Sequence, residues 1–278
     1  MKLKNKIETT FDISLKVIQR VKEEGLLYVA NDMTYKLLLS AFPLLIFVLA
    51  LMGFFTIDYH ILAANLGGFV PDQVLGMVEM IAIEVINVRR PNLLSLSLVV
   101  AVFSATSGMR RLVAGIKKAY GEEENRGFLK VYAHSLVLVL IFTLAVMLST
   151  VGIIFGAHII EAIDQVIPMG IWMVWLYNVL AILISVVVML GSVVSINKIA
   201  LDKKVKTSYV LPGAVFTVVI WGIASLGFNL YVHFFSDMAK VYGSVAGFAV
   251  FMIWINIVCH VMLVGAVVNR EMKATGSS

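Results

Sequence analysis

Uncharged polar side chains inside long apolar stretches are the residues of this chain best placed to do chemistry. They are hydroxyl and amide groups, together with one deep histidine, His260. Such groups can line a path for a polar solute through a membrane, or they can hydrogen-bond one helix to the next, which contributes about 0.6–2 kcal/mol each. A path is indicated only if several share one face. The set comprises Ser40, Ser104, Thr106, Ser107, Asn178, Ser185, Ser192, Asn229 and Asn256.

Charged groups are missing from these apolar stretches. No Asp, Glu, Lys or Arg falls inside them, so the carboxylate or amine that an ion-coupled carrier places in the membrane is not found there. A lone histidine such as His260 is more often a hydrogen-bonded structural residue than a proton relay. The five histidines show no metal-ligand spacing, and no HExxH, GxSxG or P-loop motif is present. We therefore expect no enzyme, no metal site and no cofactor.

One charged pair stands at the edge of the first apolar stretch. Asp32 and Lys36 are four residues apart, with the acid N-terminal to the base, which is the favourable order for an ion pair on a helix. An interfacial ion pair explains both residues without any ligand. With Tyr35 beside them, they also mark the first place to look for contact with a polar ligand.

The apolar stretches themselves predict an all-α membrane protein. Mean hydropathy is +0.96, with 60% hydrophobic and 14% charged residues, which lies outside the range of soluble proteins. A hydrocarbon core about 30 Å thick takes roughly 20 helical residues to cross. We expect one membrane domain over residues 1–278 with six transmembrane helices, at 37–56, 93–109, 133–156, 171–196, 209–232 and 245–268.

The basic residues predict the orientation. Of the 22 Lys and Arg residues, all but Arg89, Arg90 and Lys240 fall before the first span, after the last, or in the two connections on the same side. The positive-inside rule then places both termini in the cytoplasm of a bacterial cell, with the spans in the inner membrane. Basic charge distributed in this way reflects topology, so we expect no nucleic-acid partner.

Two segments outside the spans are amphipathic. Residues 7–21 place Ile7, Phe11, Leu15, Ile18 and Val21 at helical spacing among lysines, which predicts a helix on the inner leaflet or, alternatively, packed on the bundle's own cytoplasmic end. The external connection, 57–92, predicts two short amphipathic helices, the second opening at 71–72. They either cap the outer mouth of the bundle or lie at the interface.

Local signals indicate packing and bends. Gly243 and Gly247 form a small-xxx-small stretch, typical of close helix packing. Pro43 and Pro212 predict kinks near the inner ends of their spans. Gly121 predicts the end of a helical extension. The single cysteine, Cys259, excludes an intrachain disulfide.

Four stretches, taken together, resemble the YihY/BrkB family of bacterial inner-membrane proteins. They are NDMTYKLLLSAFPLLIFVLALMGFF (31–55), AYGEEENRGFLK (119–130), LPGAVFTVVIWGIASLGFNLYV (211–232) and YGSVAGFAVFMIWINIVCHVMLVGAVVNRE (242–271). The resemblance implies a membrane protein from a family labelled sometimes as ribonuclease and sometimes as transporter. The chain departs from the family pattern at Lys36 and Val267. Matching positions are Tyr35, Ser40, Pro43, Tyr120, Gly121, Pro212, Gly213, Tyr231, Tyr242, Gly243, Gly247, Trp254, Gly265, Asn269 and Glu271.

These observations favour a transporter or flippase-like protein for a lipid or other amphipathic solute. The alternative is a membrane scaffold or envelope assembly factor that moves nothing. A membrane nuclease is disfavoured, because the chain offers no cluster of carboxylates and histidines beside a basic groove. Membrane lipids are the expected partners, and a homodimer is compatible with the sequence.

Overall fold

The computed structural model describes residues 2–54, 72–86, 91–141, 171–201, 205–234 and 244–276, and every regular element in these ranges is a helix. The prediction of an all-α fold is confirmed for this part of the chain. The helices are α1 (Lys2–Glu23), α2 (Leu26–Phe54), α4 (Asp72–Ile86), α5 (Pro91–Ala119), Phe128–Ile141, α7 (Ile171–Ala200), α8 (Thr207–Phe234) and α10 (Ser244–Gly276).

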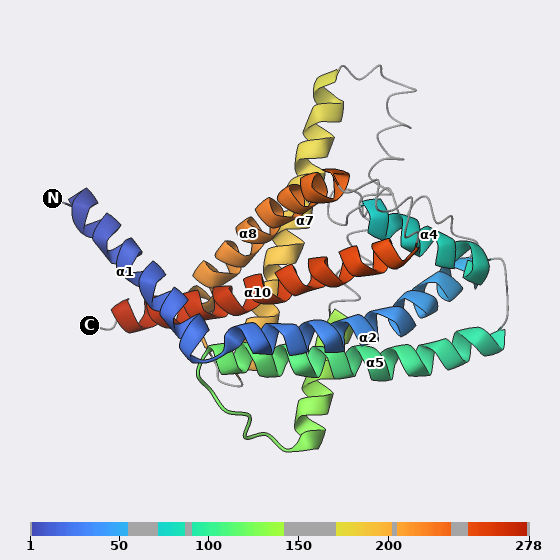
Figure 1. The fold of residues 1–278 in the computed structure, drawn as a ribbon, viewed down its shortest axis with the longest axis horizontal. Helices are drawn as coiled ribbons and strands as arrows, with labels where there is room; N and C mark the ends of the chain where they lie inside the picture. Colours follow the sequence, from blue (N-terminus) through green and yellow to red (C-terminus); the bar gives the residue numbers. More distant parts are fainter. Residues whose placement is uncertain are drawn as a thin grey trace.

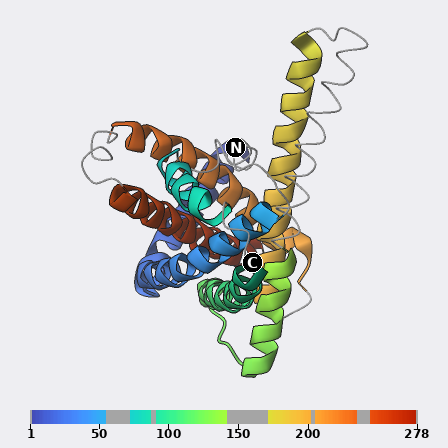
Figure 2. The same ribbon diagram turned by 90° about the vertical axis from the view of Figure 1, so that its right-hand side faces the viewer.

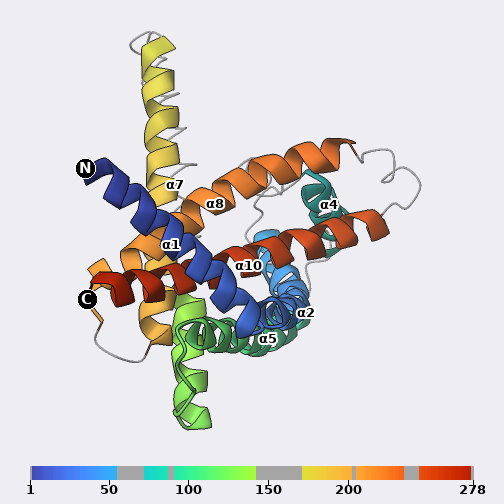
Figure 3. The same ribbon diagram turned by 60° about the vertical axis from the view of Figure 1, so that its left-hand side comes forward.

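The axes of four long helices, α2, α5, α8 and α10, lie roughly along the length of the molecule, with α2 and α5 antiparallel (Figure 1). α7 and the helix Phe128–Ile141 cross them steeply, which is clearest when the molecule is viewed along its length (Figure 2). α1 folds back over the last turns of α10, so the two chain ends lie at the same end of the bundle (Figure 3). We call this end, where the last turns of α5, α7 and α10 meet the first turns of α2 and α8, the closed end.

Several helices are longer than the apolar stretches predicted. α2 begins at Leu26 rather than at residue 37, α5 continues to Ala119 rather than ending at 109, and α10 continues to Gly276. At 1.5 Å per residue, helices of 28–33 residues measure about 42–50 Å, against a hydrocarbon core of about 30 Å. Polar helical turns therefore continue past the predicted apolar stretches at the closed end, as the expected extension up to Gly121 indicated, and the span boundaries themselves stay predictions.

Four of the described helices are long and apolar enough to cross a membrane: Ser95–Ala119, Ile182–Ala200, Thr207–Phe228 and Ala246–Ala274. The chain is therefore a multi-pass membrane protein. The predicted third span, 133–156, is represented by the helix Phe128–Ile141, and its remainder lies outside the described residues. The count of six spans stays a prediction.

The main hydrophobic core lies at the closed end. The second half of α10 forms its centre, with Cys259, Leu263, Ala266 and Val267 almost completely buried. Side chains of α1, α2, α5, α7 and α8 surround it. Further along the bundle, large apolar side chains such as Phe103, 65% exposed, face outward, as expected for surfaces that contact lipid.

α2 and α5 approach each other closely. Gly108 and Gly115 lie seven residues apart on one face of α5, and side chains of α2 fill the space that a Cβ atom would need at either position. Ser40 and Leu37 lie against Gly108, and Met33 lies against Gly115. Small residues allow such close approach of helices in membranes.

Glycines with positive φ end two helices. Gly25 (φ 63°) separates α1 from α2, and Gly121 (φ 72°) follows the last turn of α5. At the second site the Gly121 N–H donates to Lys118 O and the Glu122 N–H donates to Lys117 O, the two bonds of a Schellman motif. The break predicted at Gly121 is confirmed.

α1 and α4 both pack on the long helices. α1 buries Val17, with Ile13 and Val21 partly buried beside it, while Leu15 and Ile18 of the predicted stripe are exposed. The bundle therefore contacts Val21 of the predicted stripe together with Ile13 and Val17 outside it, and contact of Leu15 and Ile18 with lipid stays a prediction. α4 begins at residue 72 as predicted and packs against α2 and α10.

Candidate functional site

A fully buried hydrogen-bond cluster lies at the closed end. The side-chain amide of Asn269 on α10 donates to Tyr120 Oη (2.8 Å) and to Val210 O (3.0 Å), and its carbonyl oxygen accepts the Gly213 N–H (2.6 Å). Tyr120 Oη in turn donates to Asn197 Oδ1 on α7 (2.8 Å). Three side chains thus connect the end of α5 with α7, α8 and α10.

Glycine lets α8 and α10 come close enough for this cluster. A Cβ atom on Gly213 would overlap Gly265 O and lie 2.6 Å from the Asn269 amide nitrogen, while one on Gly265 would overlap Thr217 Oγ1. Pro212, just before Gly213, lies inside α8 five residues after its start, where proline removes the backbone hydrogen bond to the carbonyl four residues earlier.

The hydrogen bonds of the cluster have a structural role, because they hold helices together. Burial raises the pKa of the Tyr120 phenol, so the hydroxyl stays protonated and acts as a hydrogen-bond donor. Both N–H groups of the Asn269 amide have acceptors, so its donors are satisfied. A buried network with its donors satisfied rigidifies the helices that it joins.

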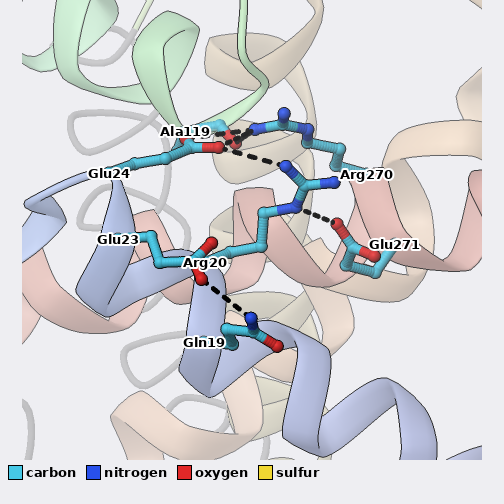
Figure 4. A network of polar contacts seen from close by, with 7 residues as sticks. All are labelled: Gln19, Arg20, Glu23, Glu24, Ala119, Arg270 and Glu271. Carbon is cyan, nitrogen blue, oxygen red and sulfur yellow. Dashed lines mark hydrogen bonds and ion pairs between the residues drawn. The ribbon is translucent and has the colours of Figure 1, made fainter.

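Ion pairs tie α1 to α10 beside this cluster (Figure 4). Arg20 Nε lies 2.8 Å from Glu271 Oε1, and Arg270 Nη1 lies 2.9 Å from Glu24 Oε1. Arg270 also donates to Ala119 O at the end of α5, where a cation is favoured by the helix dipole. A Cβ atom on Gly121 would lie 2.6 Å from the Arg270 guanidinium, so glycine serves both the turn and this contact.

Removing the charge of Glu271 is expected to loosen α1. The Glu271 side chain is 5% exposed, but Arg20 is 42% exposed, so solvent screening limits the effect of Glu271→Gln to about 1–2 kcal/mol. Amide hydrogen exchange over residues 12–23 should become roughly tenfold faster. Glu23→Gln is the matched control, because Glu23 contacts only the exposed Gln19 of its own helix in the described structure. Equal acceleration in both variants would contradict the assignment.

The loop after α5 is held by a second ion-pair group. Glu124 accepts from Arg126 Nη2 (2.6 Å) and from Lys117 Nζ (3.1 Å). The Arg126 hydrogen bond lowers the pKa of the Glu124 carboxyl to about 2, so it stays ionised at neutral pH. Two open hollows flank this loop. One, of about 490 Å³, is lined by Glu24, Ala114, Lys118, Gly121, Glu122, Glu123 and Glu124, and the other, of about 510 Å³, by Lys117, Arg126, Lys130 and neighbouring residues.

Five of the predicted ligand-contact residues lie along the junction of α2 and α5, which we call the α2–α5 seam. Arg111 of α5 forms an ion pair with Asp32, and Ser40 lies against Gly108, which fixes the register of the two antiparallel helices. Ser104, Ser107 and Arg111 then fall on the same side of α5, i, i+3 and i+7, facing the side of α2 that carries Asp32 and Lys36. The 490 Å³ hollow, lined by Ala114 and Lys118, continues the seam at the closed end.

Ser104 and Ser107 differ from the other hydroxyls in their hydrogen bonding. Ser40 donates to Leu37 O, and Thr106 and Ser192 donate to carbonyls four residues earlier on their own helices. Ser104 and Ser107 have no hydrogen-bond partner in the part of the chain that the structure describes, and both are half-buried. Arg111 Nε is likewise buried without an acceptor there.

Asn256 connects two helices. Its amide donates to Asn31 Oδ1 (2.9 Å) and Thr34 Oγ1 (3.1 Å), which joins α10 to α2. His260 Nδ1 lies 2.8 Å from Asn256 O on the same helix, which matches a structural histidine. The side chains of Asn178 and Asn229 lie outside the described residues.

Comparisons with known proteins agree with the resemblance seen in the sequence. A family model described as Virulence factor BrkB matches residues 17–277. The chain belongs to the BrkB family. It is 29% identical over 238 residues, 86% of each chain, to the ribonuclease-like protein YfkH of Bacillus subtilis (strain 168). It is 23% identical over 259 residues to a UPF0761 membrane protein of Coxiella burnetii (strain Dugway 5J108-111), covering 91% of this chain and 90% of the relative. No solved structure matches.

Most BrkB-family pattern positions in the described part of the chain gather at the closed end. They are Tyr120, Gly121, Pro212, Gly213, Gly265, Asn269 and Glu271. Others lie elsewhere: Pro43 is in the middle of α2, Tyr35 and Tyr231 are exposed, Gly247 is buried, and Trp254 contacts Trp221 edge-on. Tyr242 and Gly243 lie outside the described residues.

The sequence did not point to several residues that complete these sites. Asn197 stands just past a predicted span among lysines, and Arg20, Glu24 and Arg270 read as ordinary charges at a membrane surface. Only Arg111 could have been found from the sequence. It lies seven residues after Ser104 on a helix that continues beyond the apolar stretch, and this spacing puts both residues on the same side of the helix.

Proposed function

We propose that this protein is a flippase-like transporter that moves a lipid or other amphipathic solute along the α2–α5 seam. The observation that carries the proposal is the alignment of Ser104, Ser107 and Lys36 on one side of the helix pair, between exposed apolar surface and the hollow at the closed end. Neutral polar groups are expected to line a solute path, rather than bond one helix to another, only if several of them share one face. Ser104 and Ser107 meet that condition.

The physical basis is the cost of taking a polar headgroup through hydrocarbon. A polar group buried without a hydrogen bond loses several kcal/mol relative to water. Hydroxyl groups on the outside of a helix pair reduce that cost while the acyl chains remain in lipid. The side chain of Phe103 and other apolar residues on the outer face of α5 provide the surface for those chains.

The proposal includes six spans in the bacterial inner membrane and both termini in the cytoplasm. Two observations support it. α1 and the end of α10 contact one another, and the ends of α5, α7 and α10 meet the starts of α2 and α8. The basic residues of the described loops lie at this same closed end, which agrees with the positive-inside rule. α4, packed on α2 and α10, is proposed as a cap at the opposite end.

A scaffold or envelope assembly factor is the second candidate. The buried Tyr120–Asn269 cluster and the α1–α10 ion pairs favour it, because they fasten the closed end rather than provide a moving part. A third possibility comes from the name of YfkH, which is ribonuclease-like. We expect purified protein to cleave no RNA, with or without divalent metal ions. Metal-dependent cleavage that is lost on changing one His or Glu residue would overturn that expectation.

Reconstitution into liposomes tests the transport proposal. Vesicles carrying headgroup-labelled lipid should expose the inner-leaflet label to an added quencher faster with the protein than without it. Ser104→Ala with Ser107→Ala should slow this exposure roughly tenfold, because two headgroup hydrogen bonds of about 0.6–1 kcal/mol each are lost. Thr106→Ala is the matched control, since its hydroxyl bonds its own helix. Rates equal to those of empty vesicles would leave the scaffold candidate.

A further inference from the structure

Several hydrogen-bond donors at the α2–α5 seam have no acceptor among the described residues. In the part of the chain that the structure describes, Ser104 and Ser107 lack partners and Arg111 Nε is buried without an acceptor. Among the described residues, Lys36 Nζ contacts only an aromatic face, 5.5 Å from the centre of the Tyr35 ring. The Lys36 and Arg111 groups can only donate, and the two serine hydroxyls can donate as well, so an acceptor can satisfy all four groups.

The charges of the seam set the sign of that acceptor. Asp32 neutralises Arg111, and no other described carboxylate pairs with either Lys36 or Arg111. At the closed end, by contrast, Arg20, Arg270 and Lys117 each pair with a glutamate. The seam therefore keeps one net positive charge beside hydroxyl donors, and an anion satisfies both.

The surroundings select an anion that is attached to lipid. Leu39, 52% exposed, and Phe103, 65% exposed, flank the polar groups on the outer surface. Exposed Tyr35 and Lys36 are residue types enriched where a helix passes the membrane interface. A soluble phosphate would leave the apolar flank unused, whereas the acyl chains of a phospholipid would cover it.

We infer that the α2–α5 seam binds the phosphate group of an anionic phospholipid. Lys36 supplies the unpaired positive charge, Ser107 donates a hydrogen bond from its hydroxyl, and the Arg111 guanidinium makes a further contact. This rests on the proposed function and narrows its substrate to lipids of net negative charge. The Asp32 carboxylate holds the Arg111 guanidinium in place and is a positioning residue.

Native mass spectrometry of the detergent-solubilised full-length chain tests the inference, with phosphatidylglycerol and phosphatidylcholine as probes. Phosphatidylglycerol should bind more tightly. Lys36→Gln should weaken its binding about fivefold, because each cation near an anionic lipid contributes on that order. Ser107→Ala should weaken it by a few-fold. The preference for phosphatidylglycerol should also fall with added salt.

Two variants match these changes away from the seam. Lys16→Gln removes an exposed cation of α1, and Ser225→Ala removes a half-buried hydroxyl of α8 that has no described partner. Both should bind as the unchanged chain does. Equal affinity for the two lipids, or equal weakening by the control variants, would overturn the inference. Lipid selectivity without accelerated label exposure in liposomes would instead overturn the transport proposal and leave the binding site standing.

Discussion

Gly213→Ala is expected to lower the midpoint of thermal unfolding of the purified protein by roughly 10 °C. The added Cβ atom would overlap Gly265 O and approach the Asn269 amide, so α8 and α10 must separate. Overpacking of this kind costs about 1–3 kcal/mol, and the strained or broken Asn269 hydrogen bonds add to it. A loss of about 3 kcal/mol corresponds to that shift in a protein of this size.

Gly222→Ala on the same helix is the matched control for this prediction. In the described part of the chain, no atom outside its own helical surroundings lies within 4 Å of a Cβ placed at Gly222, and the residue is exposed. Alanine is also the better helix former, so the midpoint should stay unchanged or rise slightly. A thermal shift assay in detergent measures both. If Gly213→Ala unfolds at the same temperature as Gly222→Ala, the two helices do not meet through Gly213 and Gly265.

Features that depend on the local sequence could be predicted. The positions of α7 and α8 follow from unbroken apolar stretches, the start of α4 follows from the proline and aspartate at 71–72, and the break at Gly121 follows from glycine's tolerance of positive φ. The glycine contacts between α8 and α10 lie within stretches that carried the family resemblance. That resemblance, however, says nothing of which atoms touch.

Features that depend on pairing between helices could not be predicted. The helical period alone does not say which face of α1 packs on the bundle: Leu15 and Ile18 of the predicted stripe are exposed, whereas Val17, outside that stripe, is buried. Asn197 contacts Tyr120 only because α7 ends against α5, 77 residues earlier in the chain. The α2–α5 seam likewise became visible only once Gly108 and Ser40 fixed the register of two helices that run in opposite directions.

Asn269→Leu is expected to have the second large effect, because it removes the residue at the centre of the buried cluster. Leucine preserves the approximate volume but leaves the Gly213 N–H, Val210 O and Tyr120 Oη without the bonds that the amide provides. Buried polar groups that lose a partner cost about 1–3 kcal/mol each, partly recovered by rearrangement, so we expect a total loss of about 2–4 kcal/mol.

A double-mutant cycle with Tyr120→Phe separates this cluster from general destabilisation. Phenylalanine removes only the hydroxyl that accepts from Asn269 and donates to Asn197. If the residues act through that hydroxyl, the double variant should be more stable than the two single effects predict by about 1 kcal/mol or more. Asn256→Leu on the same helix should cost less, about 0.6 kcal/mol, as for average hydrogen bonds between membrane helices. Additive effects of Tyr120→Phe and Asn269→Leu would mean that the two residues contribute independently, and the closed end would then owe its rigidity to apolar packing around α10 rather than to the polar cluster.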